Sequence, residues 1–315
     1  MKLLKSFVIS ILFLILISHW AGEIHADDDL VSQVLTLTSG VQTKIVWVEG
    51  TSVKGFDTNS GKIKTILDNL AVPGRPLISR DGSQVIFHTG GNKTGIKDFG
   101  KPHRTYRVNW NGTDRRLLTE NGYLCSLWFD GKTEYAITMK SDRKTFLKLP
   151  LNKKGKPEII LSKGKGRAEL QLSADGRRGV HGIGSTGWID FTRKPLKIHR
   201  RYGGCRPSIA PDNSYLWFRF YSSHDRLKLF DKKGESWDVT LPYGKEESYY
   251  PRWTNHVRYL THTGRGRFNQ LFLSKFAPDF RSIEAHISIS GHAPIYHPSA
   301  RVGLAPQSPR VLPGS

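Results

Sequence analysis

A short motif recurs along the chain at intervals of about 40–45 residues, a spacing typical of repeat proteins. It consists of an apolar residue, a Ser or Thr, any residue and Asp-Gly, followed by a short apolar run. The clearest copy spans residues 76–82 and leads into Val85-Ile86-Phe87. The turn positions of successive copies are Asp81, Asp130, Asp175, Asp212 and His256.

Each copy predicts a β-hairpin, because Gly and Asn accept the positive φ that tight hairpin turns require. In the clearest copy a third strand over residues 105–110 and a fourth over 117–119 follow. Four antiparallel strands in about 40–45 residues make one blade of a β-propeller. A weaker first copy is predicted upstream, with a strand at residues 35–37, a turn near Gly40 and a strand at 44–48. The sequence therefore predicts an all-β fold, a six-bladed propeller of four-stranded antiparallel blades over residues 27–290.

The blades resemble the TolB-like, WD40-like (PD40) propellers of bacterial envelope proteins. The Trp-Ser-Pro-Asp-Gly core of that family is present here as residues 78–82 and, in degenerate form, as 253–256. The runs 204–214 and 251–256 also resemble uncharacterised secreted single-propeller bacterial proteins. The resemblance implies the fold but no activity, because such propellers support many functions.

The two ends differ in composition from the repeats. Residues 1–26 have the basic start, apolar core (residues 7–17) and terminal small residue of a secretory signal, which predicts a periplasmic or secreted protein; an uncleaved anchor is the alternative. Residues 291–315 contain five prolines, which we expect to prevent regular structure and to leave a tail that packs across the propeller or lacks order. His292, Tyr296 and His297 are weaker candidate site residues in this tail.

The chain is strongly basic, with 48 Lys and Arg against 27 Asp and Glu and a formal charge of +21. Such a charge concentrates anionic partners near the surface. For an exported protein we expect an acidic polysaccharide or an envelope protein, with nucleic acid less favoured. Charge tuned only for solubility is the alternative.

Three arginines, Arg75, Arg206 and Arg252, lie at or near the starts of the predicted inner strands. A guanidinium group matches the oxygens of a carboxylate or sulfate, so a ring of arginines would suit an anionic glycan or a peptide carboxylate. Alternatively, each arginine pairs with the turn Asp of a neighbouring blade.

Imidazole and basic side chains recur near the ends of the second strands, where they could converge at one end of the channel. A metal site at His88, His224 and His262 is a weak possibility, and no cofactor is expected. Trp188, placed in a predicted Gly-rich loop, is a candidate for stacking on a sugar. The candidate binding residues at the strand ends, together with Trp188, are His88, His181, Trp188, Arg219, His224 and His262.

The two cysteines, Cys125 and Cys205, fall near the starts of inner strands in predicted blades three and five. Either a disulfide or two separate thiols is consistent with this placement. The favoured function is an exported recognition or scaffold protein that binds an acidic glycan or an envelope protein. The alternative is a polysaccharide lyase or hydrolase acting at the channel.

Overall fold

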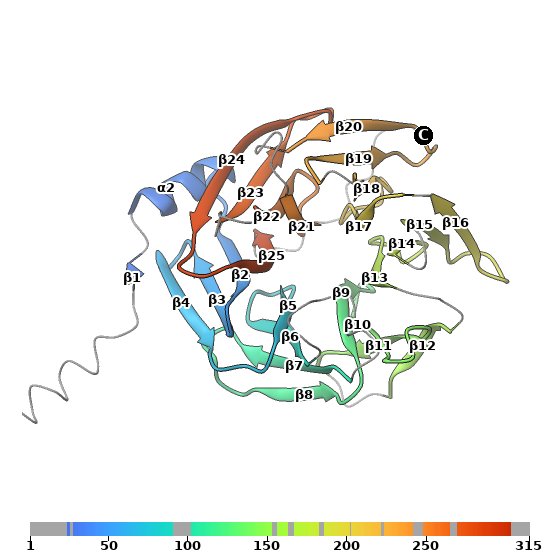
Figure 1. Ribbon diagram of the computed structural model, residues 1–315, viewed down its shortest axis with the longest axis horizontal. Coiled ribbons are helices and arrows are strands. Elements are labelled where there is room, and N and C mark those ends of the chain that lie inside the picture. Colours follow the sequence, from blue (N-terminus) through green and yellow to red (C-terminus); the bar gives the residue numbers. More distant parts are fainter. Residues whose placement is uncertain are drawn as a thin grey trace, which may run out of the picture.

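The computed structural model describes residues 24–25, 28–90, 102–152, 156–162, 167–182, 186–201, 203–221, 224–241, 248–264 and 270–303. Within these ranges the strands form six antiparallel sheets arranged around a common centre (Figure 1). The predicted fold, a six-bladed β-propeller of four-stranded blades, is confirmed. Of the predicted signal segment 1–26, all but the strand β1 (Ile24–His25) lies outside the described residues. No helix in the described ranges is long and apolar enough to cross a membrane.

Blades 2 to 6 are each built from four consecutive strands, the first of which lies nearest the centre (Figure 1). Blade 2 contains β5 (Pro73–Ile78), β6 (Gln84–Thr89), β7 (Arg104–Asn109) and β8 (Arg116–Thr119), and blade 3 contains β9 (Tyr123–Phe129), β10 (Glu134–Met139), β11 (Phe146–Pro150) and β12 (Glu158–Leu161). Blade 4 contains β13 (Arg167–Leu172), β14 (Arg178–Gly182), β15 (Thr186–Asp190) and β16 (Lys197–Arg201). Blade 5 contains β17 (Cys205–Ile209), β18 (Trp217–Phe220), β19 (Arg226–Phe230) and β20 (Ser236–Thr240), and blade 6 contains β21 (Ser248–Trp253), β22 (Tyr259–Gly264), β23 (Gln270–Phe276) and β24 (Ile283–Ser290).

The recurring Asp lies in the turn between the first and second strands of a blade. Asp81 accepts hydrogen bonds from Ser79 Oγ at 2.7 Å and from the backbone N–H of Ser83 at 2.9 Å. The following Gly82 has a φ of 73°. The repeated motif is therefore a turn motif, because a carboxylate can satisfy turn amides and Gly accepts the left-handed backbone.

Blade 1 joins the two ends of the chain. Its strands β2 (Thr43–Glu49), β3 (Ser52–Asp57) and β4 (Lys62–Leu67) are completed on the inside by β25 (Ile295–Val302). The expectation that prolines keep residues 291–315 out of regular structure is wrong for this segment. Pro298 is accommodated because the register with β2 shifts at that point, so no ladder hydrogen bond from its missing N–H is needed. Residues 304–315 lie outside the described ranges.

The predicted strand at residues 35–37 is also wrong, because these residues end the helix α2 (Asp28–Leu37). Val34 and Leu37 are buried against Trp47 of blade 1 and Tyr259 of blade 6. The hydroxyl of Tyr259 donates a hydrogen bond to the carbonyl of Leu37 at 3.1 Å. Apolar residues spaced three or four apart give the helix one buried face, so α2 covers the seam where blades 1 and 6 meet.

Candidate functional site

Each of the six inner strands (β5, β9, β13, β17, β21 and β25) carries a β-bulge where it pairs with the second strand of its blade. A bulge places an extra residue out of the ladder and re-aims its side chain. Neighbouring inner strands contact one another around the centre. The bulges therefore bring one set of side chains to the central channel.

In four of the six bulges the extra residue stands directly before a proline and has a positive φ. These residues are Arg75, Arg206, Tyr250 and His297, with φ of 45°, 53°, 53° and 51°. The residue before a proline is disfavoured in the right-handed helical region, and a left-handed conformation costs a non-glycine residue about 1–3 kcal/mol. Four repetitions of this strained conformation at one level of the channel point to a functional surface.

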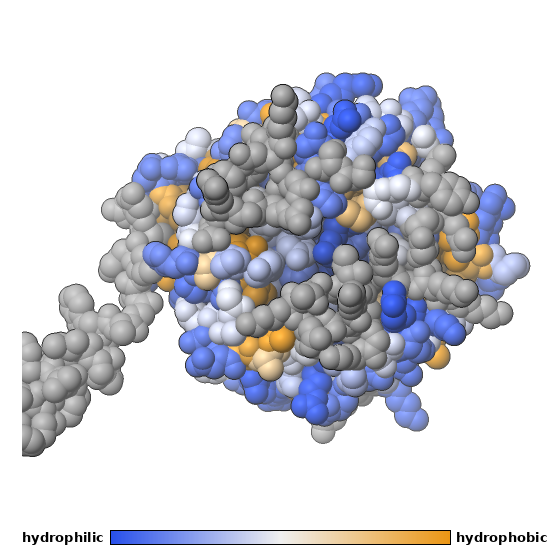
Figure 2. Space-filling model, in the orientation of Figure 1, coloured by the Kyte–Doolittle hydropathy of each residue, from blue (hydrophilic) through white to orange (hydrophobic). Residues whose placement is uncertain are grey.

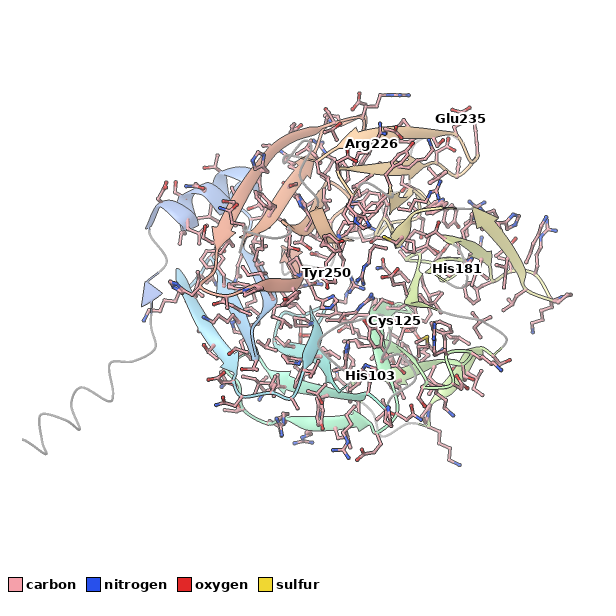
Figure 3. All side chains as sticks on the ribbon, in the orientation of Figure 1. His103, Cys125, His181, Arg226, Glu235 and Tyr250 are labelled. Carbon is pink, nitrogen blue, oxygen red and sulfur yellow. The ribbon has the colours of Figure 1, made fainter. Side chains whose placement is uncertain are left out.

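The bulged residues line one small cavity with a volume of about 30 Å³. Its walls are formed by residues from five inner strands, and three of the four prolines that follow the bulged residues, Pro207, Pro251 and Pro298, also line it. The polar and aromatic lining residues are Arg75, Glu169, Gln171, Arg206, Tyr250, Arg252 and His297. Figure 3 shows Tyr250 and Cys125 near the centre of the propeller, and Figure 2 shows hydrophilic residues at the centre of one face. The cavity holds about two water-sized groups, so it suits one small polar group of a ligand.

The charge in this cavity is unbalanced. Arg75 Nη2 and Arg206 Nη1 donate to the same oxygen of Glu169, Oε1, at 2.9 and 3.1 Å. Arg252 Nη2 donates to the backbone carbonyl of Cys125, which carries no formal charge. Arg75 Nε has no hydrogen-bond partner among the described atoms. The cavity thus holds three guanidinium groups and one carboxylate, and the excess positive charge favours a further anion.

Burial and the nearby arginines lower the pKa values of two cavity residues, Arg252 and His297. Burial, together with the Arg75 guanidinium, lowers the pKa of Arg252 to about 9. Burial and then Arg75 and Arg206 hold the pKa of His297 well below its ordinary value. At neutral pH Arg252 remains charged and His297 is neutral, so the imidazole is available as a hydrogen-bond acceptor or base.

A series of hydrogen bonds that begins at the cavity residue Gln171 links the inner strands of blades 4, 5 and 6. The side-chain oxygen of Gln171 accepts a hydrogen bond from Ser208 Oγ at 2.9 Å, and Ser208 Oγ accepts one from the backbone N–H of Trp253 at 3.1 Å. Ser126 Oγ likewise donates to the carbonyl of Leu170 at 2.7 Å. These bonds hold neighbouring inner strands at fixed spacing, so the arginines are preorganised.

Comparison with known proteins identifies the fold. No family model and no curated protein matches the chain. TolB from Acinetobacter baumannii is similar in structure, with a TM-score of 0.60 at 16% identity over 86% of this chain and 71% of TolB. The chain has the TolB-like β-propeller fold. A chain of the nidogen/laminin complex gives a TM-score of 0.59 at 8% identity over 82% of this chain and 98% of that one. The periplasmic gluconolactonase of Pseudomonas aeruginosa gives 0.50 at 14% identity over 80% and 84%.

This TolB-like propeller brings the three predicted arginines together at one cavity. The predicted alternative, pairing of each arginine with the turn Asp of a neighbour, is not what the contacts of Arg75 and Arg206 show, because both bond to Glu169. The sequence reasoning missed Glu169 and Tyr250 and placed His297 only in a tail. The signal that could have found Tyr250 and His297 is the residue-proline pair that recurs in four inner strands.

The predicted histidines occupy separate places. His88 is buried near the cavity, with its ring 4.2 Å from that of Tyr123 and 5.3 Å from that of His103. His181 is buried inside blade 4, and His262 lies in blade 6 with Nε2 3.1 Å from Ser274 Oγ. The described ranges contain no cluster of three or more His, Cys, Asp and Glu able to hold a metal ion. The weak metal site at His88, His224 and His262 is therefore not assembled in this part of the chain.

Two other candidates have structural neighbours of their own. Trp188 lies in strand β15 and not in a loop; its ring stacks on His199 at 3.7 Å, and the Arg178 guanidinium lies 4.6 Å from it. The neighbouring Gly187 does not interrupt the strand, since it pairs within the sheet, and residues 183–185 of the predicted loop lie outside the described residues. Arg219 donates to the carbonyl of Gly203 in the same blade. Neither residue lines the channel cavity.

His262 makes the stability of the TolB-like propeller sensitive to acid. Burial, with a smaller effect of His286, lowers its pKa to about 3. Since a histidine in an unfolded chain has a pKa of about 6.5, the unfolded state binds a proton that the folded state excludes between these two pH values. The free energy of unfolding should therefore fall as the pH decreases through this window, by at most about 1.4 kcal/mol per pH unit from this group.

The variant His262→Gln tests this origin, because an amide can still bond to Ser274 but does not titrate. We expect its unfolding free energy, measured by urea denaturation, to change less than that of the parent between pH of about 7 and about 5. Equal pH dependence in the two proteins would contradict the assignment.

Proposed function

We propose that this chain is an exported recognition protein that binds a carboxylate-bearing ligand, of the acidic glycan class, at its central channel. The observation that carries the proposal is the convergence of Arg75, Arg206 and Arg252 on a cavity with one carboxylate, Glu169. The three guanidinium groups exceed the available negative charge, and guanidinium groups bind carboxylates with matching geometry. The signal-like segment 1–26 supports export.

Aromatic rings beside the arginines favour a sugar over an isolated anion. The Tyr250 ring lies 4.5 Å from the Arg206 guanidinium and 4.0 Å from the His297 ring. Tyr296, which is 40% exposed, has its ring 6.1 Å from that of Tyr250. Aromatic faces pack against the apolar face of a sugar ring. In this arrangement a uronate carboxylate enters the small cavity, which Tyr250 lines, while the sugar ring rests on the exposed Tyr296.

A polysaccharide lyase is the second candidate, and one observation favours it. The imidazole of His297 lies beside Tyr250 and the arginines, with its ring 4.0 Å from the Tyr250 ring. In a uronate polymer, arginines that neutralise the carboxylate would make the neighbouring C–H bond more acidic, and the imidazole would accept its proton. Such an enzyme releases a product with a carbon–carbon double bond, which a pure binding protein does not.

The test is calorimetric titration of the protein with oligogalacturonate and with a neutral oligosaccharide of equal length, while ultraviolet absorbance records unsaturated product. Arg206→Gln should weaken oligogalacturonate binding roughly 10-fold to 100-fold, the effect of losing one charged hydrogen bond of about 1.5–3 kcal/mol. The matched control is Arg226→Gln in β19, which removes an exposed arginine paired with Asp238 near the outer edge (Figure 3).

Four outcomes separate the candidates. Oligogalacturonate binding that Arg206→Gln weakens and Arg226→Gln leaves intact supports the recognition function, and unsaturated product supports the lyase. Equal losses in the two variants would show that general surface charge, and not the cavity, binds the ligand. No binding of either sugar would contradict both glycan functions and leave an envelope protein as the partner.

A further inference from the structure

A thiol and an imidazole meet beside the channel cavity. Cys205 begins the inner strand β17, and its Sγ lies 3.2 Å from Nε2 of His224. The His224 ring lies 4.7 Å from the ring of Tyr249, which belongs to blade 6. Cys205 is partly exposed and directly precedes Arg206, which lines the cavity.

The pair has the geometry of an activated thiol. An imidazole at hydrogen-bonding distance can accept the thiol proton, giving a thiolate and an imidazolium that stabilise each other. Cys205 also packs against the apolar cluster that contains Phe218 and Phe220. The ring of His224 is thus placed to accept the thiol proton when its Nε2 is unprotonated.

The other cysteine, Cys125, is buried, whereas Cys205 is partly exposed. Cys125 is fully buried in β9, its Sγ lies 3.5 Å from the carbonyl of Tyr123, and burial raises the pKa of its thiol to about 12. Such a thiol is unreactive at neutral pH because the thiolate is the nucleophile. Since the chain has two cysteines in all, Cys125 is an internal reference for the reactivity of Cys205.

We propose that Cys205 is a nucleophilic thiol that captures low-molecular-weight disulfides as a mixed disulfide, with His224 as its proton acceptor. His224 takes the thiol proton, and the Cys205 thiolate attacks one sulfur of the disulfide. The disulfide bond breaks as the new S–S bond forms, and the departing sulfur leaves with the electron pair and takes the proton back from the imidazolium. Cys205 is oxidised, and the departing half of the disulfide is reduced to a thiol. Because Cys125 is buried in another blade, the product persists until an external thiol releases it.

The experiment measures the rate of alkylation by iodoacetamide and of mixed-disulfide formation with 2-hydroxyethyl disulfide, followed by mass spectrometry of the intact protein and its peptides. Both probes are uncharged, so the result does not depend on anion binding in the cavity. At a pH of about 7 we expect Cys205 to react about tenfold faster than glutathione, because proton transfer to His224 increases its thiolate fraction, and Cys125 to remain unmodified.

Two variants identify the role of His224. His224→Asn retains a residue that tolerates the positive φ of 57° at this position but cannot accept the proton, and it should reduce the Cys205 rate about tenfold. His286→Gln, which removes an exposed imidazole on β24, is the control and should leave the rate unchanged. A Cys205 rate no greater than that of glutathione, or an equal rate in His224→Asn and the parent at equal melting temperature, would overturn the proposal.

Discussion

A chain that ends after Ser290 should fail to form the folded propeller. The truncation removes β25, whose residues 298–302 are buried, and leaves β2 without its inner partner. It also removes His297 and Pro298 from the cavity. A typical domain has a free energy of unfolding of only about 5–15 kcal/mol. We expect the loss of a whole inner strand to remove most of this stability.

Circular dichroism and thermal melting test this expectation. The matched control is a chain that ends after Gly303, which retains every described strand. We expect cooperative melting in the control and a broad, low-temperature transition or aggregation in the shorter chain. If both melt cooperatively within a few degrees of each other, β25 does not close the ring as described.

Glu169→Gln should be the most damaging single substitution at the cavity. It leaves the guanidinium groups of Arg75, Arg206 and Arg252 close together without their one carboxylate. Removing one partner of a buried ion pair costs about 3–5 kcal/mol, because the remaining charge is left uncompensated. We expect a corresponding fall in the free energy of unfolding, measured by urea denaturation.

The control is Glu158→Gln, which removes an exposed carboxylate that pairs with Lys148 on an outer strand. Exposed pairs contribute at most about 1 kcal/mol, so its stability should stay near that of the parent. Added oligogalacturonate should restore part of the lost stability of Glu169→Gln if the cavity accepts a carboxylate. Equal stability of the two variants would show that Glu169 does not balance the arginines.

Much of the fold could be predicted because each blade repeats one local signal. The turn Asp and Gly residues act within a few residues of themselves, as Asp81 does with Ser79 and Ser83, so their effect is visible in a short window. Closure of the ring depends instead on pairing between the two ends of the chain, which no short window of sequence shows. It pairs Lys44 with Arg301, and no local pattern indicates which end of the chain supplies the inner strand of blade 1.

The candidate site likewise has a part that could be predicted from the sequence and a part that could not. The positions of Arg75 and Arg206 at inner strands follow from the repeat, and the structure brings them together. Their partner Glu169 could not be predicted, because that contact joins different blades and depends on the spacing of the closed ring. Trp188 was misplaced because glycines beside it indicated a loop, whereas pairing with neighbouring strands decides its conformation.

The bulges in the inner strands separate the chemistry of the channel from the architecture that supports it. A residue set outside the ladder contributes little to strand pairing, and a following proline has no N–H to contribute. An exchange at these positions therefore leaves strand pairing intact when the new residue tolerates a positive φ, as Gly, Asn, Asp and His do, although at Arg75 or Arg206 it also breaks the ion pair with Glu169. The residues that face the cavity thus lie outside the hydrogen-bond ladders that build the blades, so the ladders do not depend on which side chains the cavity carries.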